Sequence, residues 1–310
     1  MLKTNESIKK VFHNFGFTDV KKIRKIDVGF CNDVYSIDEK YILKVNKDIA
    51  DERDLEKEVF FCNLFKNKIP APEVLVFDTS KKLLPNYFII YRQIQGDNLY
   101  NKWHLLTDPQ RRHVIKQICG FLKKINNTSA DSYIKKFKVD AAVSWEGYIY
   151  KKINNWLDKF EKNKKLSYET IKKVKNFCQV DRGILAESKM ALTYFDAHFD
   201  NFIVQGDTVV GMLDFERTDW LSIDYSLELV DRMVKEPKKY SSEKTEKYIK
   251  DKDYKDLLSM YQKYYPKLFA FKNFHKRLAI YNVEHYLSDI FYFPKVKSLR
   301  EGLNKVLIKV

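Results

Sequence analysis

The strongest constraint in this sequence is a β-hairpin pattern inside a half of the chain that otherwise has helical periodicity. Two short apolar runs, Phe202–Val204 and Val209–Leu213, flank the turn-forming tripeptide Gln205-Gly206-Asp207. Around the hairpin, apolar residues recur at helical spacing over 108–126, 144–162, 166–179, 243–264, 268–290 and 296–308. A hairpin embedded among helices predicts a fold that mixes strands with helices, and composition and cysteine spacing exclude a collagen, a coiled-coil rod and a disulfide scaffold.

The first 95 residues have a different character. We expect a helix over 4–15, strands within 20–30 and 41–45 joined through 32–40, an amphipathic helix over 51–67, and strands within 70–78 and 86–94. After Gly96 the helical patterns dominate. We therefore predict an α+β fold of two lobes, a small β-rich N-terminal lobe of residues 1–95 and a larger helical C-terminal lobe of residues 96–310.

Composition narrows the class of protein. Hydrophobic residues make up 45% of the 310 residues and charged residues 32%, a balance typical of an ordered globular chain. No apolar run reaches 18 residues, and the N-terminus lacks the apolar core of a secretory signal, so we expect no membrane association. The four cysteines show no paired spacing, which favours reduced thiols in a cytoplasmic protein.

Charge is distributed unevenly. The formal net charge of +15 invites a nucleic-acid hypothesis. However, residues 181–231 carry eleven acids and three bases, so a strongly acidic segment lies within a basic chain. We therefore do not expect nucleic acid as a partner, and the acidic segment is compatible with a small acceptor that carries positive charge.

The acids around the hairpin predict a metal and phosphate site. Asp196 precedes the first strand, Asn201 follows five residues later, and Asp214 closes the second strand. Because the hairpin brings Asn201 and Asp214 together, their oxygens suit Mg²⁺, and Asp196 is left to accept a proton from a substrate hydroxyl. The plain alternative is an acidic loop that caps a helix or binds water. We expect Asp200 to face solvent or cap the loop, and His198 to pack within it.

A phosphate site also needs a cation and a cover. Lys44 lies in the apolar run YILKV, where a buried lysine requires an acidic partner. Glu58 shares the face of the 51–67 helix that holds the aromatic residues, so we expect a Lys44–Glu58 ion pair, with Glu52 and Glu56 as competitors. The alternative is a lysine at a strand edge that reaches solvent. The turn over 28–33, with Gly29 and Asn32, is a candidate phosphate cover, although a single glycine is equally typical of a β-turn.

The order of the motifs VGFCNDVYSI, YILKV, EVFFCNLF, NYFIIYRQIQG, YFDAHFDN and GMLDFE resembles the aminoglycoside phosphotransferase and choline kinase-like family, whose fold is that of the protein kinases. The resemblance spans about residues 20 to 235. It implies Asp196 as catalytic base and Asn201 and Asp214 as Mg²⁺ ligands. It further implies Lys44 as the phosphate lysine with Glu58 as its partner.

The resemblance implies further contacts and two departures. The segment Arg92–Ile94 matches the backbone that binds the purine of ATP or GTP, the turn of Gly29 and Asn32 matches the phosphate cover, and Asp224 matches an acid that braces the catalytic loop. Tyr194 and Phe195 stand where the family pattern has His and Gly.

These observations predict a Mg²⁺-dependent small-molecule kinase. Its partners are ATP or GTP and a hydroxylated acceptor, for which an aminoglycoside-like antibiotic, and hence a role in antibiotic resistance, is the first candidate. A metabolite kinase acting on a choline-like, amino-alcohol or sugar acceptor is the second. A catalytically silent kinase-like scaffold or a basic nucleic-acid-binding module is the alternative from another class.

Overall fold

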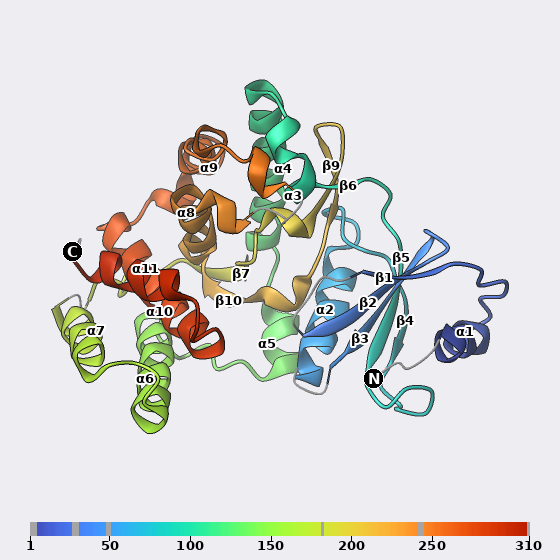
Figure 1. The fold of residues 1–310 in the computed structure, drawn as a ribbon, viewed down its shortest axis with the longest axis horizontal. Helices are drawn as coiled ribbons and strands as arrows, with labels where there is room; N and C mark the ends of the chain where they lie inside the picture. The colour runs from blue at the N-terminus through green and yellow to red at the C-terminus, as the bar shows by residue number, and fades with distance from the viewer. Residues whose placement is uncertain (1–4, 27–30, 48–50, 181–182, 241–244, 309–310) are drawn as a thin grey trace. The chain divides into compact units, whose positions relative to one another are not determined.

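The computed structural model describes residues 5–26, 31–47, 51–180, 183–240 and 245–308 (Figure 1). The chain forms two compact units. The first holds residues 1–124, 198–218 and 241–248, and the second holds 125–197, 219–240 and 249–310. The division into lobes of residues 1–95 and 96–310 stays a prediction.

An antiparallel sheet forms the centre of the first unit. Its strands are β1 (Ile23–Ile26), β2 (Asn32–Ile37), β3 (Tyr41–Asn46), β4 (Val74–Asp78) and β5 (Phe88–Arg92), in the order β1-β2-β3-β5-β4. The expectation of only two strands before residue 46 is wrong, because the supposed connection over 32–40 contains β2. Asn32, Asp33 and Ser36 hide the strand signal, and the strand forms because β1 and β3 pair with it on both sides.

The two faces of this sheet have different roles. On one face, Leu43 and Val45 of β3 pack in a core with α1 (Asn5–Asn14). Since side chains alternate along a strand, Ile42 and Lys44 point to the other face. Beside β4 and β5 lies α2 (Glu52–Phe65), capped by the carboxylate of Asp51, which accepts from the backbone N–H of Arg53 (Figure 1).

The expected hairpin is present in the first unit. It consists of β8 (Phe202–Gln205) and β9 (Thr208–Met212), with β6 (Asp97–Asn98) paired to β8. Gly206 makes the turn at φ 62°. Gly96 lets the chain approach β8, since a Cβ there would lie 2.7 Å from the carbonyl oxygen of Val204. The chain then continues through α3 (Leu99–Lys102), a 3-10 turn at Trp103–Leu105 and α4 (Asp108–Asn126).

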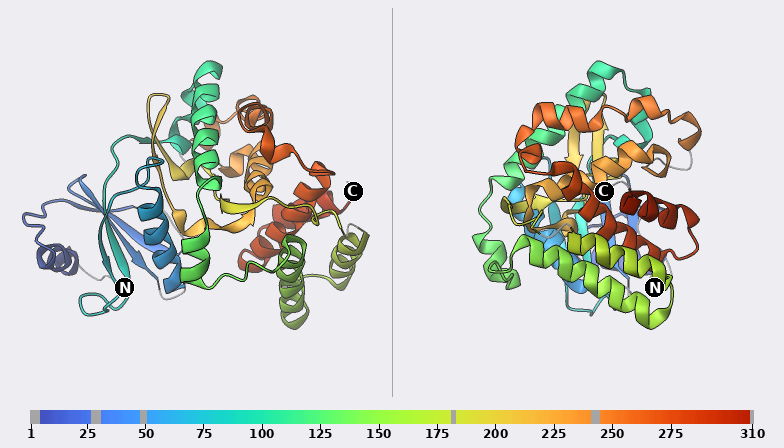
Figure 2. Two further views of the ribbon diagram at one scale, coloured as in Figure 1. Left: turned by 180° about the vertical axis from the view of Figure 1, so that it is seen from behind. Right: turned by 90° about the vertical axis from the view of Figure 1, so that its left-hand side faces the viewer.

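The second unit is mainly helical. It contains α5 (Asp131–Phe137), α6 (Trp145–Asn163), α7 (Tyr168–Val180), α8 (Leu227–Lys235), α9 (Leu257–Tyr264), α10 (Phe274–Tyr292) and α11 (Lys297–Ile308). Within it, α10 packs against α6, α8 and α11 (Figure 2). Two short strands, β7 (Met190–Tyr194) and β10 (Thr218–Ser222), pair with each other.

One expected helix is mostly wrong. Of the pattern over 243–264, the structure describes residues 245–264. Among these only α9 is α-helical, and the residues before it form single 3-10 turns at Glu246–Tyr248 and Asp251–Asp253. Aspartates there favour local turns, because their short side chains compete for backbone N–H groups. The helices expected over 108–126, 144–162, 166–179 and 296–308 are confirmed, with ends that shift by at most two residues. The helix expected over 268–290 begins six residues later, at Phe274.

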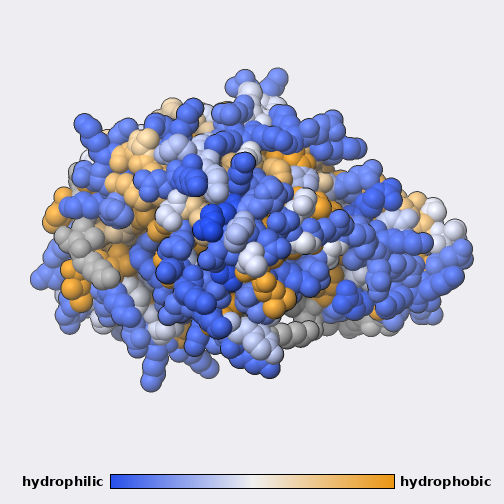
Figure 3. All heavy atoms as spheres, turned by 90° about the horizontal axis from the view of Figure 1, so that it is seen from above, coloured by the Kyte–Doolittle hydropathy of each residue, from blue (hydrophilic) through white to orange (hydrophobic). Residues whose placement is uncertain are grey.

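The described residues include no helix that is long and apolar enough to cross a bilayer. The face drawn in Figure 3 is mostly hydrophilic, with hydrophobic residues in small groups. All four cysteines are free.

Candidate active site

Lys44 is the cation of a buried charged cluster. Its side chain lies on the face of β3 opposite Leu43, and the residue is 7% exposed. Its Nζ lies 2.6 Å from Oε2 of Glu58 on α2, so the ion pair expected from the sequence is present. Glu52, one of the competing acids, instead pairs with Lys81 at 2.5 Å.

The turn after β9 brings two more carboxylates to this lysine. The Lys44 Nζ lies 2.8 Å from Oδ1 of Asp214 and 3.3 Å from Oε2 of Glu216. Asp214 adopts a left-handed conformation with φ 60°, and the following Phe215 packs its buried ring against Phe65 of α2. The aromatic contact therefore anchors the turn that presents both acids.

Asn201 lies beside Asp214, as the hairpin pattern predicts. The N–H of Leu213 donates to the backbone carbonyl of Asn201 at 2.8 Å, which holds the two strand ends together. Both Asn201 and Asp214 line the same cavity.

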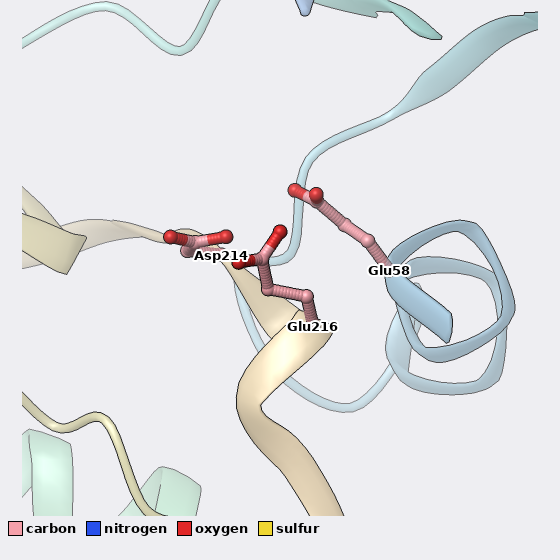
Figure 4. A group of neighbouring side chains, drawn as sticks. All are labelled: Glu58, Asp214 and Glu216. Carbon is pink, nitrogen blue, oxygen red and sulfur yellow. The ribbon is translucent and has the colours of Figure 1, made fainter. Parts of the chain in front are cut away.

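Three acids share this cluster with one ammonium. Glu58, Asp214 and Glu216 point toward one another, and each offers an oxygen within 4.8 Å of the others (Figure 4). Burial raises the pKa of Glu58 to about 7, and the negative charges of Asp214 and Glu216 add to this against the opposing effect of Lys44. Burial also raises the pKa of Glu216. The three carboxylates outnumber the one ammonium, and carboxylate oxygens are ligands that suit a divalent cation such as Mg²⁺.

Lys44 itself stays charged. Burial on its own lowers the pKa of this ammonium, but the carboxylates of Asp214, Glu58 and Glu216 raise it well above its usual value. The ammonium of Lys44 is therefore a fixed positive charge at the wall of the cavity.

The cavity has a volume of about 390 Å³, within the range of small-molecule sites. Among its polar lining residues are Lys44, Glu58, Asn201 and Asp214. Its other walls are largely apolar and come from the sheet and the hairpin, with Ile26, Val34, Ile42, Tyr91, Ile94 and Ile203. A largely apolar cavity that also holds a lysine and carboxylates suits a ligand that combines a flat ring with phosphate groups.

The residues expected to contact the nucleotide are placed as follows. Ile94 lines the cavity, and among the described residues its backbone makes no hydrogen bond, so both of its polar groups can bind a ligand. Arg92 also borders the cavity, but its guanidinium pairs with Glu73 at 2.7 Å. Asn32 is buried and donates to Glu216 at 3.4 Å. Gly29 lies outside the described residues.

Asp196 follows the end of β7 in the second unit and is half-buried. The expectation that its neighbour Asp200 faces solvent is wrong. Asn98 donates to the Asp200 carbonyl at 2.7 Å and to its Oδ1 at 2.9 Å, and Asp200 lines the cavity instead of facing solvent. His198 stacks on Tyr100 with ring centroids 5.3 Å apart, the loop-packing role expected for it.

The model of the phosphotransferase enzyme family matches residues 22–225, more than half of the chain. The chain belongs to the phosphotransferase enzyme family. This confirms the family and the enzyme class expected from the order of the motifs. No curated protein matches the sequence.

Solved aminoglycoside phosphotransferases share the fold of this family member. An ADP-bound aminoglycoside phosphotransferase, APH(2'')-Ib, has a TM-score of 0.70 at 17% sequence identity. The alignment covers 98% of this chain and 96% of the chain of that protein. A gentamicin complex of APH(2'')-IIa has a TM-score of 0.72 at 18% identity, and the alignment covers 100% of this chain and 98% of that chain. A complex of APH(2'')-IIIa with GDP and kanamycin has a TM-score of 0.72 at 12% identity, and the alignment covers 98% of this chain and 97% of that chain. The likeness shows the α+β, kinase-like fold expected from the sequence.

The two departures from the family pattern are accommodated. Tyr194 is completely buried at the end of β7. Phe195 does not adopt a positive φ, so a large side chain is tolerated where the pattern has glycine. Its ring packs against Tyr225 with centroids 5.4 Å apart.

Sequence reasoning missed one member of this phosphotransferase's cluster and misplaced another acid. Glu216 was visible as an acid two residues after Asp214, next to an apolar residue, but nothing local shows that it is buried at Lys44. Asp224 was expected to brace the loop of Asp196. Among the described residues its carboxylate instead accepts hydrogen bonds from Ser222, Arg277 and Tyr281.

Proposed function

We propose that this phosphotransferase is a small-molecule kinase that transfers the γ-phosphate of ATP or GTP to a hydroxyl of an aminoglycoside-like acceptor. One observation carries the proposal. The Lys44 ammonium is held at 2.6 Å by Glu58 and at 2.8 Å by Asp214 at the wall of a cavity that is otherwise largely apolar. Phosphoryl transfer needs such a fixed cation because charge spreads over the phosphoryl oxygens in the transition state.

The nucleotide is bound by the first unit in this proposal. The purine lies among the apolar side chains and bonds to the backbone at Ile94, while Asn32 and the turn of Gly29 cover the phosphates. Lys44 contacts the phosphates, and Glu58 fixes its direction.

Mg²⁺ fits the carboxylates of this site, because three acids face one lysine. Asn201 and Asp214 are the proposed ligands, and Glu216 is a further oxygen donor within reach of Asp214. When bound, the ion neutralises charge on the phosphates.

Asp196 is the proposed base on the acceptor side. It accepts the proton of the acceptor hydroxyl as the oxygen of that hydroxyl bonds to the γ-phosphorus. The bond from this phosphorus to the bridging oxygen breaks, and the nucleoside diphosphate leaves with that oxygen.

The acidic segment supports a cationic acceptor only in part, because the structure neutralises several of its acids. Asp224 pairs with Arg277, Glu228 with Arg232, and Asp231 with Lys235. This internal pairing leaves fewer acids for a polycationic aminoglycoside and favours a second candidate, a metabolite alcohol with at most one positive charge, such as a choline-like, amino-alcohol or sugar acceptor. If the acceptor is an antibiotic, resistance to that antibiotic is the biological consequence.

A nucleotide-consumption screen tests the proposal. The purified protein is incubated with Mg²⁺ and ATP or GTP, and with kanamycin, gentamicin, choline, ethanolamine or a hexose. We expect acceptor-dependent release of nucleoside diphosphate, and its loss in Asp196→Asn. Consumption with aminoglycosides supports the first candidate, and consumption with choline, ethanolamine or the hexose alone supports the second. Absence of turnover with every acceptor and both nucleotides would overturn the proposal.

A further inference from the structure

We infer that Arg277 of α10 is a positioning residue for the segment that carries Asp196. The inference rests on the role proposed above for Asp196. Arg277 and Asp224 are both 0% exposed, and the Arg277 Nε donates to Oδ2 of Asp224 at 2.7 Å. A charge pair that is completely removed from water is stable only if each of its polar atoms has a hydrogen-bond partner. Here those partners lie on separate elements.

The carboxylate of Asp224 is saturated. Its Oδ1 accepts from Ser222 Oγ at 2.5 Å and from Arg277 Nη2 at 3.2 Å. Its Oδ2 accepts from Arg277 Nε and from the hydroxyl of Tyr281 at 2.9 Å. Asp224 therefore has no free lone pair for the loop of Asp196, and its role there must be indirect.

The other edge of the guanidinium holds a second segment. The Arg277 Nη1 donates to the backbone carbonyls of Ile184 and Glu187, each at 2.8 Å. These carbonyls lie in the stretch that leads directly into β7, the strand that ends at Tyr194, two residues before Asp196. Only a planar group with several fixed donors bonds to a carboxylate and two carbonyls at once, so lysine cannot reproduce this arrangement.

The two segments that Arg277 holds are also joined to each other. The N–H of Lys189 donates to Ser222 Oγ at 3.3 Å, and the N–H of Ile223 donates to the Lys189 carbonyl at 3.0 Å. Next to Asp224, the ring of Tyr225 packs against Phe195. Arg277 thus fixes β7, which leads into the Asp196 segment, and the turn at Asp224, whose neighbour Tyr225 packs against Phe195.

Turnover and backbone exchange of matched variants test this inference. Arg277→Lys keeps the charge and loses the planar set of donors. We expect kcat to fall about 10- to 100-fold, because small misplacements of a catalytic group are costly, while nucleotide affinity stays within about twofold. Backbone amides of residues 190–197 should exchange with deuterium faster than in the wild type. If Arg277→Lys does not fold, Tyr281→Phe should show the same changes to a smaller degree. This variant removes one donor to Asp224 and the acceptor of Arg277 Nη2 and Trp145 Nε1.

Arg232→Lys is the matched control. Arg232 is also a buried arginine on a helix, and among the described residues its guanidinium makes ion pairs with Glu228 and Asp289 and a cation–π contact with Tyr240, none of which belongs to the Asp196 segment. It should lose a similar amount of thermal stability with kcat within about twofold and with unchanged exchange at 190–197.

Two results would overturn the inference. One is wild-type kcat and exchange in folded Arg277→Lys, and the other is an equal fall in both arginine variants. If the wild type turns over no acceptor, the proposed function fails, and the exchange comparison still decides whether Arg277 holds residues 190–197.

Discussion

The ammonium of Lys44 lies 2.6 Å from the carboxylate of Glu58, although one residue lies on a strand and the other on a helix. Glu58 is 2% exposed, and both charges are shielded from water. The same ammonium lies 2.8 Å from Asp214, which the hairpin supplies. Three elements therefore meet at one charge, and their substitutions should be coupled.

Lys44→Met and Glu58→Gln should each lower turnover. The loss of activity in the double variant should be far smaller than the sum of the losses in the two single variants. Residues in direct contact show coupling energies of about 0.5–3 kcal/mol, and each single change here removes the same interaction. The measurement is kcat/KM across the four proteins of a double-mutant cycle.

The matched control for this cycle is Glu52→Gln, because Glu52 lies on the same helix but pairs with Lys81. Its effect should add independently to that of Lys44→Met. Additive losses for Lys44 and Glu58 would show that the ion pair has no shared role in turnover.

Stability of the ligand-free protein should fall as pH rises from about 4.5 to about 7. The pKa of Glu58 is raised to about 7 in the folded state, so the folded protein keeps a proton that the unfolded chain has already lost. The contribution is at most about 3.4 kcal/mol, from 1.36 kcal/mol per pKa unit over the shift from 4.5 to about 7. Urea unfolding at several pH values should show this slope in the wild type and a shallower one in Glu58→Gln. An unchanged slope in that variant would assign the effect to other groups.

Mg²⁺ together with ATP or GTP should raise the melting temperature, and Asp214→Ala should lose most of the part that depends on Mg²⁺. Binding to the folded state stabilises it by mass action, by about 2.7 kcal/mol at a ligand concentration of 100 times Kd. A thermal shift assay with and without Mg²⁺ separates the two contributions. Asp207→Asn in the hairpin turn is the control and should retain the full shift. A full Mg²⁺ shift in Asp214→Ala would remove Asp214 from the metal site.

Asp196→Asn should reduce turnover by at least about 10²-fold and leave nucleotide affinity near the wild-type value. General-base catalysis contributes about 10²–10⁴-fold, and the change keeps shape while removing the charge. Asp200→Asn is not a silent control, because Asp200 accepts from Asn98 and borders the cavity. Asp158→Asn, exposed on α6, serves instead. Full activity in Asp196→Asn would show that another group takes the proton.

The sequence by itself determined the local elements of this protein. The helix over 108–126 and the hairpin around Gly206 form where the pattern places them, because helical periodicity and turn chemistry act over a few neighbouring residues. The motif order around Lys44, Asp196 and Asp214 was enough to indicate the phosphotransferase family, since these residues keep their order along the chain.

Tertiary structure decided what depends on distant partners. β2 forms because two strands flank it, and most of the described residues 245–256 leave the helical pattern despite its periodicity. Glu216 joins Lys44 across 172 positions, and Arg277 joins Asp224 across 53. No local pattern encodes such pairs, because the free energy of a buried charge depends on the groups that replace its water, and only the folded chain brings those groups together.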